Sequence, residues 1–341
     1  MSTIIRFGID LAKNSFAICG IDERGAVALR KTLARAKLLE FFANTPAAVV
    51  AMEAGSGAHH WARELSALGH EARIIDPRLV APYRHHGRTG KNDLNDALAI
   101  CEAAGRPRMR FIPIKTKEQQ AVLLVHRLRQ ACVTEHTRLV NRLRGFLAEF
   151  GIVAPKGAAA LKVRWRTIRQ RHDRDLPLLA WQVLEELHEQ LNTLHRQVLA
   201  YDRQINAFVR ENPQAKQLAQ VNGIGPITAS AIVATIGNGR DFHNGRQFAA
   251  WIGLTPRQYS TGGTPRLGRI SKRGDAYLRT LLVHGARSEL MHTARRNDRK
   301  SRWAESLKKT KSWNKSSVAL ANKHARIAWA LLANDQPYRP A

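Results

Sequence analysis

Short apolar runs alternate with amphipathic stretches through the first hundred residues of the chain. Runs with a period of two predict strands, and apolar residues three or four positions apart predict helices. Strands are predicted at residues 4–10, 15–21, 26–31, 47–52 and 72–77, and helices at 38–42, 61–68 and 93–100, with a basic, loop-like segment at 78–91. This order, three strands followed by alternating helices and strands, predicts an α/β domain.

Four carboxylates follow these predicted elements at three places. Asp10 ends the first strand, and Glu53 ends the fourth. Asp93 and Asp96 lie one helical turn apart at the start of the last helix, which Asn92 or Asp93 can cap. Ligands of α/β sheets bind outside the carboxyl ends of the strands, and Mg²⁺ prefers oxygen ligands, so the pattern predicts a magnesium site. The alternative for the aspartate pair is a helix start whose acids complement the helix dipole.

A long helical pattern covers residues 117–150 and carries a basic face opposite its apolar residues. The arginines on this face that we consider as phosphate contacts are Arg127, Arg138 and Arg142. Such a face either contacts phosphates or is only solvated, and the pattern does not decide between the two. Residues 158–174 continue the basic character.

Apolar residues between positions 184 and 208 recur with alternating spacings of three and four. This is the heptad seam of a coiled coil, which needs a partner helix. The partner is either a preceding helix of the same chain, in a hairpin, or a second protomer. We favour an oligomerisation element, because the seam is narrow and its flanks stay charged.

A glycine-rich turn with Gly223 and Gly225 precedes an apolar helix at residues 229–236. The pattern resembles a helix-hairpin-helix element, in which backbone amides and a helix N-terminus hold a DNA phosphate. A plain helix start in a packed helical domain is the alternative. The predicted domains are residues 1–152, 153–212 (a basic helix and the coiled coil) and 213–341.

The charge of the chain indicates its partner. Its 341 residues include 55 Lys and Arg against 27 Asp and Glu, a formal net charge of +28, which favours a polyanion such as nucleic acid. The N-terminus lacks the charged and apolar blocks of a signal peptide, and no apolar stretch reaches the length of a membrane span, so we expect a cytoplasmic, nucleoid-associated protein without membrane contact. Three scattered cysteines suggest neither a disulfide nor a zinc site.

Several motifs occur together in an order that is typical of one family. They are Gly8-Ile9-Asp10-Leu11-Ala12-Lys13, Glu53-Ala54, Lys91-Asn92-Asp93-Leu94-Asn95-Asp96, Gly223-Ile224-Gly225 and the segment from Ser260 to Gly274. With them, nearly the whole chain resembles the DEDD insertion-sequence transposases. The resemblance implies an RNase H-like, RuvC-like α/β domain, a helical coiled-coil connector and a mainly helical C-terminal domain.

The resemblance also implies a function, an RNA-guided DNA recombinase. A structured non-coding guide RNA would pair with donor and target double-stranded DNA, and Mg²⁺ would be bound by Asp10, Glu53, Asp93 and Asp96. A C-terminal serine would attack a DNA phosphate. We assign this role to Ser260 rather than Thr261, because a hydroxyl without a β-methyl group is less hindered.

In a composite active site, Ser260 of the C-terminal domain would meet the metal bound by the acids of the N-terminal domain. The resemblance implies that these domains come from different protomers of a homo-oligomer, a dimer or a tetramer. The cations that follow the serine are candidates for holding a phosphate; they are Arg266, Arg269, Lys272 and Arg273.

Two other classes of function fit parts of the pattern. A structure-selective, Mg²⁺-dependent DNA nuclease of the resolvase kind would use only the carboxylates and an activated water. A non-enzymatic nucleic-acid-binding protein would use its acids for structure alone.

Overall fold

The computed structural model describes residues 3–84, 92–334 and 337–339, in two compact units, Met1–Thr116 and Lys117–Ala341. This division by contacts places the helix that begins at Lys117 with the second unit. The proposed domain limits at 152 and 212 follow the sequence motifs and stay a prediction. None of the described helices is both long and apolar enough to span a membrane.

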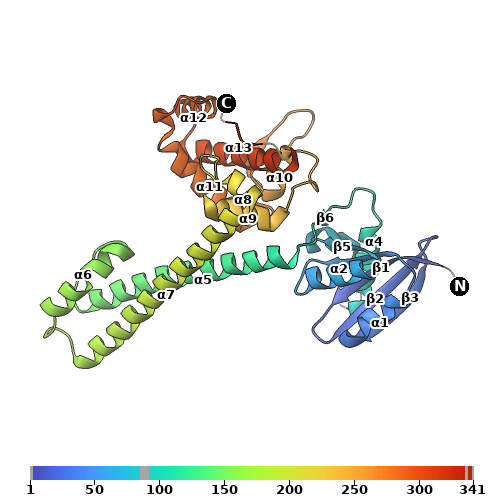
Figure 1. Ribbon diagram of the computed structural model, residues 1–341, viewed down its shortest axis with the longest axis horizontal. Helices are drawn as coiled ribbons and strands as arrows, with labels where there is room; N and C mark the ends of the chain where they lie inside the picture. Colours follow the sequence, from blue (N-terminus) through green and yellow to red (C-terminus); the bar gives the residue numbers. More distant parts are fainter. Residues whose placement is uncertain (1–2, 85–91, 335–336, 340–341) are drawn as a thin grey trace. The chain divides into compact units, whose positions relative to one another are not determined.

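The first unit is built on one mixed sheet of order β3-β2-β1-β4-β5-β6 (Figure 1). Its strands are β1 (Ile4–Leu11), β2 (Ser15–Asp22), β3 (Val27–Ala34), β4 (Val49–Glu53), β5 (Glu71–Ile75) and β6 (Phe111–Ile112). The first three are antiparallel, β1, β4 and β5 are parallel, and β6 is an antiparallel edge. The expectation of an RNase H-like fold is confirmed.

Helices cover both faces of this sheet. On one face, α1 (Leu38–Ala43) and α2 (Ala58–Ala67) enclose a core that includes Phe7, Phe16 and Trp61. On the other, α4 (Asp93–Ala104) packs against β1 and β2. A Cβ on Gly8 would lie 2.1 Å from the carbonyl oxygen of Ala97, so only glycine lets the backbone of α4 lie directly on β1. The start of α4 is thereby fixed beside the end of β1.

The segment predicted as a loop at 78–91 is partly helical, which corrects that prediction. Pro77–Val80 forms the short helix α3, and Ala81–Tyr83 forms a 3-10 turn, η2. The side chain of Asp76 caps α3, and Pro77 at its first position favours a helix start. The rest of that segment, 85–91, lies outside the described residues. The edge strand β6 was not predicted, because two residues carry no periodicity.

Two long helices form an antiparallel hairpin in the second unit, α5 (Lys117–Glu149) and α7 (Leu178–Glu211), with α6 (Ala158–Arg171) between them in sequence (Figure 1). An ion pair of 2.5 Å between Arg129 Nε and Asp202 Oδ1 ties α5 to α7.

The heptad seam of α7 packs inside its own chain. Leu184 and Leu191 are buried in a cluster with Leu143 of α5 and Trp165 of α6. The seam is therefore used at these positions for an intramolecular hairpin, the first of the two alternatives, and the pairing of two protomers stays a prediction. The physical reason is that α5 supplies the complementary apolar stripe over its C-terminal half, where Leu143 and its neighbours are buried. The oligomeric state itself stays a prediction.

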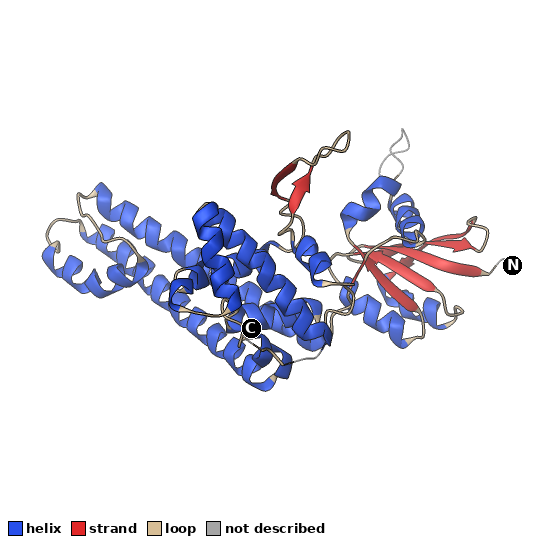
Figure 2. Cartoon of the chain, turned by 90° about the horizontal axis from the view of Figure 1, so that it is seen from above, coloured by secondary structure: helices blue, strands red, loops and turns tan. Residues whose placement is uncertain are grey.

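Short helices complete the second unit around one large core. They are α8 (Pro213–Leu218), α9 (Pro226–Ile236), α10 (Gly245–Ile252), α11 (Ala276–Leu290), η3 (Thr293–Arg295), α12 (Arg299–Thr310) and α13 (Trp313–Asn334). The helix α9 is buried almost all round, as its uninterrupted apolar sequence indicates. A two-stranded ribbon, β7 (Pro256–Gln258) and β8 (Leu267–Ile270), projects from these helices (Figure 2).

A buried histidine joins α5 to this core. His126 Nδ1 lies 2.9 Å from Tyr277 Oη, and its Nε2 lies 3.0 Å from Ser230 Oγ. Burial, helped by the charge of Arg129, lowers the pKa of His126 from its usual 6.5 to about 4. The imidazole is therefore neutral in the folded protein at pH 7 and is held by two hydroxyl groups.

We expect stability to fall with acid through this histidine. In the unfolded chain His126 takes up a proton near pH 6.5, whereas the folded protein resists protonation down to about pH 4. Between these values the unfolded state binds more protons, and up to about 3 kcal/mol of unfolding free energy is lost as the pH falls. Urea unfolding from pH 7.5 to 4.5 measures this slope. In His126→Gln, which keeps a polar side chain without the titration, the slope should be shallower, and equal slopes would contradict the prediction.

Candidate active site and nucleic-acid interface

The strand ends and the helix start gather three of the four predicted acids. Asp10 is the next-to-last residue of β1, and Glu53 is the last residue of the neighbouring parallel strand β4. Asp96 lies in the first turn of α4. The Oδ1 of Asn92 accepts a hydrogen bond of 3.0 Å from the backbone N–H of Leu94, which makes Asn92 the helix cap and leaves both aspartates for other contacts.

A guanidinium group lies between two of these acids. Arg84 Nη2 is 2.6 Å from Glu53 Oε1, and Arg84 Nε is 3.0 Å from Asp96 Oδ1. Both carboxylates are largely buried, with 19% and 15% of their side chains exposed. The arrangement places one cation between these two acids.

The electrostatics of Glu53 connect the same residues. Burial raises the pKa of Glu53, and the charges of Asp10 and Asp96 raise it further, while the guanidinium of Arg84 lowers it; the net direction is upward. The negative charges of neighbouring carboxylates create a field that favours a cation. A raised pKa in such a cluster is also what functional sites commonly show.

The chemistry of these donors suits Mg²⁺, although their present geometry holds Arg84 instead. Carboxylate oxygens are the ligands that Mg²⁺ prefers, and Arg84 stands where a cation is needed. Within residues 3–84, 92–334 and 337–339, no three Asp, Glu, His or Cys side chains converge closely enough to hold a metal. Asp93, the fourth predicted ligand, is exposed one turn before Asp96.

The predicted nucleophile lies on the β7–β8 ribbon (Figure 2). Ser260 is exposed, and its Oγ accepts a hydrogen bond of 2.7 Å from the Nε2 of Gln258. Thr261 is exposed as well and pairs with Thr264 across a turn whose two glycines have positive φ. Both hydroxyls are therefore accessible, and the structure does not select one of them.

The base of the ribbon is fixed by close backbone packing. A Cβ on Gly274 would lie 1.8 Å from the carbonyl oxygen of Trp251, and one on Gly253 would lie 2.1 Å from the carbonyl oxygen of Arg273. Both glycines also have positive φ. The ribbon thus projects from a rigid joint. Its predicted phosphate contacts, Arg266, Arg269, Lys272 and Arg273, are all exposed.

Comparison with known proteins decides the family. A family model described as "Transposase IS116/IS110/IS902 family" matches residues 215–301, and a model of the IS110 DEDD domain, described as "Transposase", matches residues 7–152. The chain is 48% identical over 336 residues to a "Probable family 20 transposase" of Pseudomonas aeruginosa, with 98% of each chain covered. The chain belongs to the IS110 family of transposases.

Two further relatives agree with this assignment. The chain is 40% identical over 331 residues to the "Transposase for insertion sequence element IS1328" of Yersinia enterocolitica, with 97% of each chain covered. It is 38% identical over 339 residues to the "Transposase for insertion sequence element IS1111A" of Coxiella burnetii, covering 99% of this chain and 92% of the relative. The chain is thus a transposase, a DNA strand-transfer enzyme, and its DEDD domain implies a divalent metal.

The glycine-rich turn of the transposase lies between α8 and α9, and its role as a helix-hairpin-helix element stays a prediction. Gly223 has a φ of 86°, and a Cβ there would lie 2.3 Å from Cε1 of His324. Gly225, the residue before α9, is exposed and has open space around it. The first glycine therefore serves packing, and the second leaves the N-terminus of α9 approachable.

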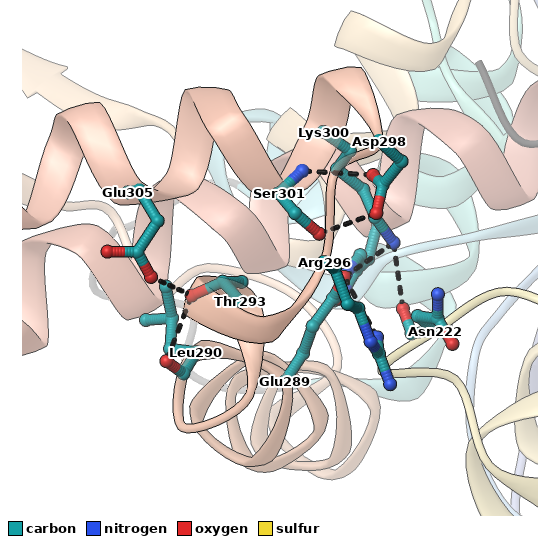
Figure 3. A network of polar contacts seen from close by, with 10 residues as sticks. Asn222, Glu289, Leu290, Thr293, Arg296, Asp298, Lys300, Ser301 and Glu305 are labelled. Atoms are coloured by element: carbon teal, nitrogen blue, oxygen red, sulfur yellow. Dashed lines mark hydrogen bonds and ion pairs between the residues drawn. The ribbon is translucent and has the colours of Figure 1, made fainter.

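A buried network of charges supports this turn (Figure 3). Glu289 Oε1 forms an ion pair of 2.9 Å with Lys300 Nζ, and its Oε2 lies 2.6 Å from His324 Nε2. Lys300 Nζ also donates to the carbonyl oxygen of Asn222, at 3.0 Å, in the turn itself. Burial would raise the pKa of Glu289, but the hydrogen bonds and charges of His324 and Lys300 lower it. Burial lowers the pKa of His324, so Glu289 is charged and His324 neutral.

The basic face of α5 has mixed roles. Arg127, Arg138 and Arg142 are exposed, and Arg138 Nη1 lies 3.3 Å from Glu135 Oε2 on the same helix. Arg129, in contrast, pairs with Asp202 of α7 and holds the hairpin. The three exposed arginines therefore remain available for phosphates, whereas Arg129 is structural.

Sequence reasoning missed Arg84, Glu289, Lys300 and His324. Arg84 lies in a segment with several basic residues, and nothing in the sequence distinguishes it from Arg78, which pairs with Asp76 at the surface. The network residues are separated by long stretches of chain and belong to no motif. The available signal was the pair of glycines in the turn, since close packing at Gly223 requires something beneath it.

Proposed function

We propose that this transposase is an RNA-guided DNA recombinase that cuts and rejoins donor and target DNA through Ser260, assisted by Mg²⁺ on Asp10, Glu53, Asp93 and Asp96. The observation that carries the proposal is the set of acids at the ends of β1 and β4 and the start of α4, in which Glu53 and Asp96 already hold one cation, Arg84. An exposed serine on a basic ribbon supports the second half of it.

The proposed reaction exchanges one phosphodiester for another. The Oγ of Ser260 forms a bond to a DNA phosphorus while one bridging phosphorus–oxygen bond breaks, and the departing DNA oxygen takes up a proton. Rejoining is the reverse, with a DNA hydroxyl releasing the serine. Bound Mg²⁺ supplies Lewis acidity for a phosphate at the acids. Arg266 and Arg269, exposed beside the serine, hold the phosphate by charge-assisted hydrogen bonds.

A composite site from two protomers of a dimer or tetramer supplies what Ser260 lacks on its own ribbon. Its hydrogen-bond partner Gln258 is an amide and cannot act as a base. A serine hydroxyl needs a base or a metal for attack, and the acids provide both a metal site and carboxylates.

Nucleic acid is held over separate basic surfaces in this proposal. The net charge of +28 and the exposed Arg127, Arg138 and Arg142 on α5 suit the backbone of a structured guide RNA. The exposed glycine of the hairpin turn, Gly225, lets a DNA phosphate approach the N-terminus of α9, while Gly223 holds the turn in place.

One observation favours a second candidate, a resolvase-like nuclease that uses water. The amide partner of Ser260 offers no activation within the ribbon, and an acid cluster alone can direct a metal-activated water. The two candidates differ in whether protein becomes bonded to DNA.

Trapping of a covalent adduct separates them. The purified transposase is incubated with nicked suicide substrates of the element ends, and protein–DNA adducts are resolved by denaturing electrophoresis. We expect adduct from wild type and Thr261→Ala and none from Ser260→Ala. Adduct from Ser260→Ala but not Thr261→Ala would move the nucleophile to Thr261, and strand exchange by both variants would overturn the serine mechanism.

The guide is tested on the same preparation. Nucleic acid extracted from the purified protein should contain one discrete RNA whose loops match the DNA flanking the gene, detected by sequencing. Full strand exchange after complete RNase digestion would overturn the RNA-guided part of the proposal.

A further inference from the structure

The contacts of Arg84 involve the same oxygen atoms that a metal would need. Its Nη2 contacts Oε1 of Glu53, and its Nε contacts Oδ1 of Asp96. An oxygen that accepts a short, charge-assisted hydrogen bond cannot offer the same lone pair to Mg²⁺. Arg84 and a metal between these two acids are therefore alternatives.

We propose that Arg84 is an internal counter-ion that occupies the acid cluster in the metal-free transposase and is displaced when Mg²⁺ binds. This inference rests on the proposed metal site at Asp10, Glu53, Asp93 and Asp96. It assigns a positioning role to Arg84. The guanidinium holds Glu53 and Asp96 close together in the metal-free protein and leaves both carboxylates when the metal binds.

The two contacts of Arg84 differ in a way that makes displacement feasible. The contact to Glu53 is a hydrogen bond of 2.6 Å with good geometry. The Nε, although buried, has no hydrogen bond of acceptable geometry, so its 3.0 Å approach to Asp96 is an ion pair only. About a third of the Arg84 side chain is exposed, which gives the guanidinium a path to solvent. To displace Arg84, a metal therefore has to replace one hydrogen bond, to Glu53, and one ion pair, to Asp96.

Charge balance favours the exchange. The negative charges of Asp10 and Asp96 both act on Glu53, and the guanidinium of Arg84 brings one positive charge against this negative charge. A divalent ion neutralises more of it from one point. The cluster is thus stable enough to fold without metal, and it favours Mg²⁺ when the ion is present. The apparent affinity for Mg²⁺ is weakened as a result, because only the fraction of molecules in which Arg84 is displaced can bind the ion.

Metal titration of the full-length protein tests the proposal. Mn²⁺, a stand-in for Mg²⁺ that electron paramagnetic resonance detects, is titrated into wild type, Arg84→Gln, Arg84→Lys and Glu53→Gln. We expect Arg84→Gln to bind about tenfold more tightly than wild type, since one charge-assisted hydrogen bond no longer competes. Arg84→Lys should lie between them, because lysine keeps the charge but not the fork of donors. Glu53→Gln should lose the site.

A matched control is available in the same segment. Arg78→Gln removes the same charge from an arginine that pairs with Asp76 at the surface and should leave the Mn²⁺ affinity unchanged. If Arg84→Gln binds Mn²⁺ no more tightly than wild type while Glu53→Gln loses the site, the role of Arg84 is overturned and the proposed metal site stands. Binding that is the same in all variants, or absent from wild type, would overturn the proposed metal site and with it the inference.

A second measurement follows Arg84 itself in the wild-type protein. The Nε–H signal of Arg84 in the ¹⁵N–¹H spectrum of wild type is assigned by its absence from Arg84→Lys spectra, or by residue-specific labelling if that variant fails to fold. Saturating Mg²⁺ should move it toward the position of a solvated arginine. An unmoved signal at saturation would show that Arg84 stays on the acids, which overturns the displacement.

Discussion

Asp96→Asn should lose strand cleavage by about a thousandfold while the protein still folds and binds DNA. Asp96 is half of the contact with Arg84 and stands beside Asp10 and Glu53 at the end of the sheet. A bound metal contributes several kcal/mol of charge stabilisation in phosphoryl transfer, and each 1.4 kcal/mol is a factor of ten in rate. Asparagine keeps the shape but removes the charge. Single-turnover cleavage of labelled element ends measures the effect.

A second acid of the same helix serves as the control. Glu102→Gln removes one negative charge near the other end of α4, away from the cluster, and should cleave within about twofold of wild type. DNA binding by gel shift should be equal in both variants, because the change in net charge is equal. Full cleavage by Asp96→Asn would contradict the catalytic role of the cluster. If cleavage is instead lost while DNA binding is intact, the non-enzymatic alternative is excluded.

Asp93→Asn tests whether the fourth acid belongs to the same set. Asp93 is exposed one turn from Asp96 and contributes to the first turn of α4, where an acid also complements the helix dipole. As a metal ligand it should lose cleavage nearly as strongly as Asp96→Asn. If Asp93→Asn cleaves fully and only destabilises the helix slightly, Asp93 complements the helix dipole and is not a metal ligand.

The sequence could predict those parts of the site that depend on local structure. Asp10 and Glu53 follow from strand ends and Asp96 from a helix start, and each of these lies where expected. The two short strands of the Ser260 ribbon were not predicted. That these acids lie near one another depends on strand order, which the family resemblance supplied and the periodicity alone did not.

Interactions between distant segments could not be predicted. The heptad seam indicates a helical partner, but it does not say which helix, because the stripe on α5 is irregular: Leu124 and Leu128 fit the pattern and are 56% and 52% exposed. Arg84 differs from the neighbouring arginines only because it contacts Glu53, which is 31 residues away in sequence. Such contacts follow from the packing of whole elements and leave no periodic trace.

The network beneath the hairpin turn gives the largest expected effect on stability. Glu289 has no exposed side-chain surface, and two of its three partners are buried as well, with His324 fully enclosed and Lys300 nearly so, while the third, Arg296, is more exposed. Removing one member of a buried ion pair leaves an uncompensated charge, which typically costs about 3–5 kcal/mol. Glu289→Gln should therefore lower the midpoint of thermal unfolding by roughly 10 °C.

The exposed pair on α5 provides the matched control for this substitution. Glu135→Gln breaks the contact with Arg138, in which both side chains are largely exposed, and should cost less than about 1 kcal/mol. A loss in Glu289→Gln as small as in the control would show that Lys300 finds other partners and that the network is not a stabilising unit.

A double variant separates the charge from the packing. Glu289→Leu combined with Lys300→Met replaces the pair by apolar groups, and it should be more stable than either single variant because no unpaired charge stays buried. The double variant still lacks the hydrogen bond from Lys300 to the carbonyl oxygen of Asn222. We therefore expect it to recover stability but not DNA affinity, since the turn with Gly223 and Gly225 loses its support. Recovery of both would separate the network from the nucleic-acid interface.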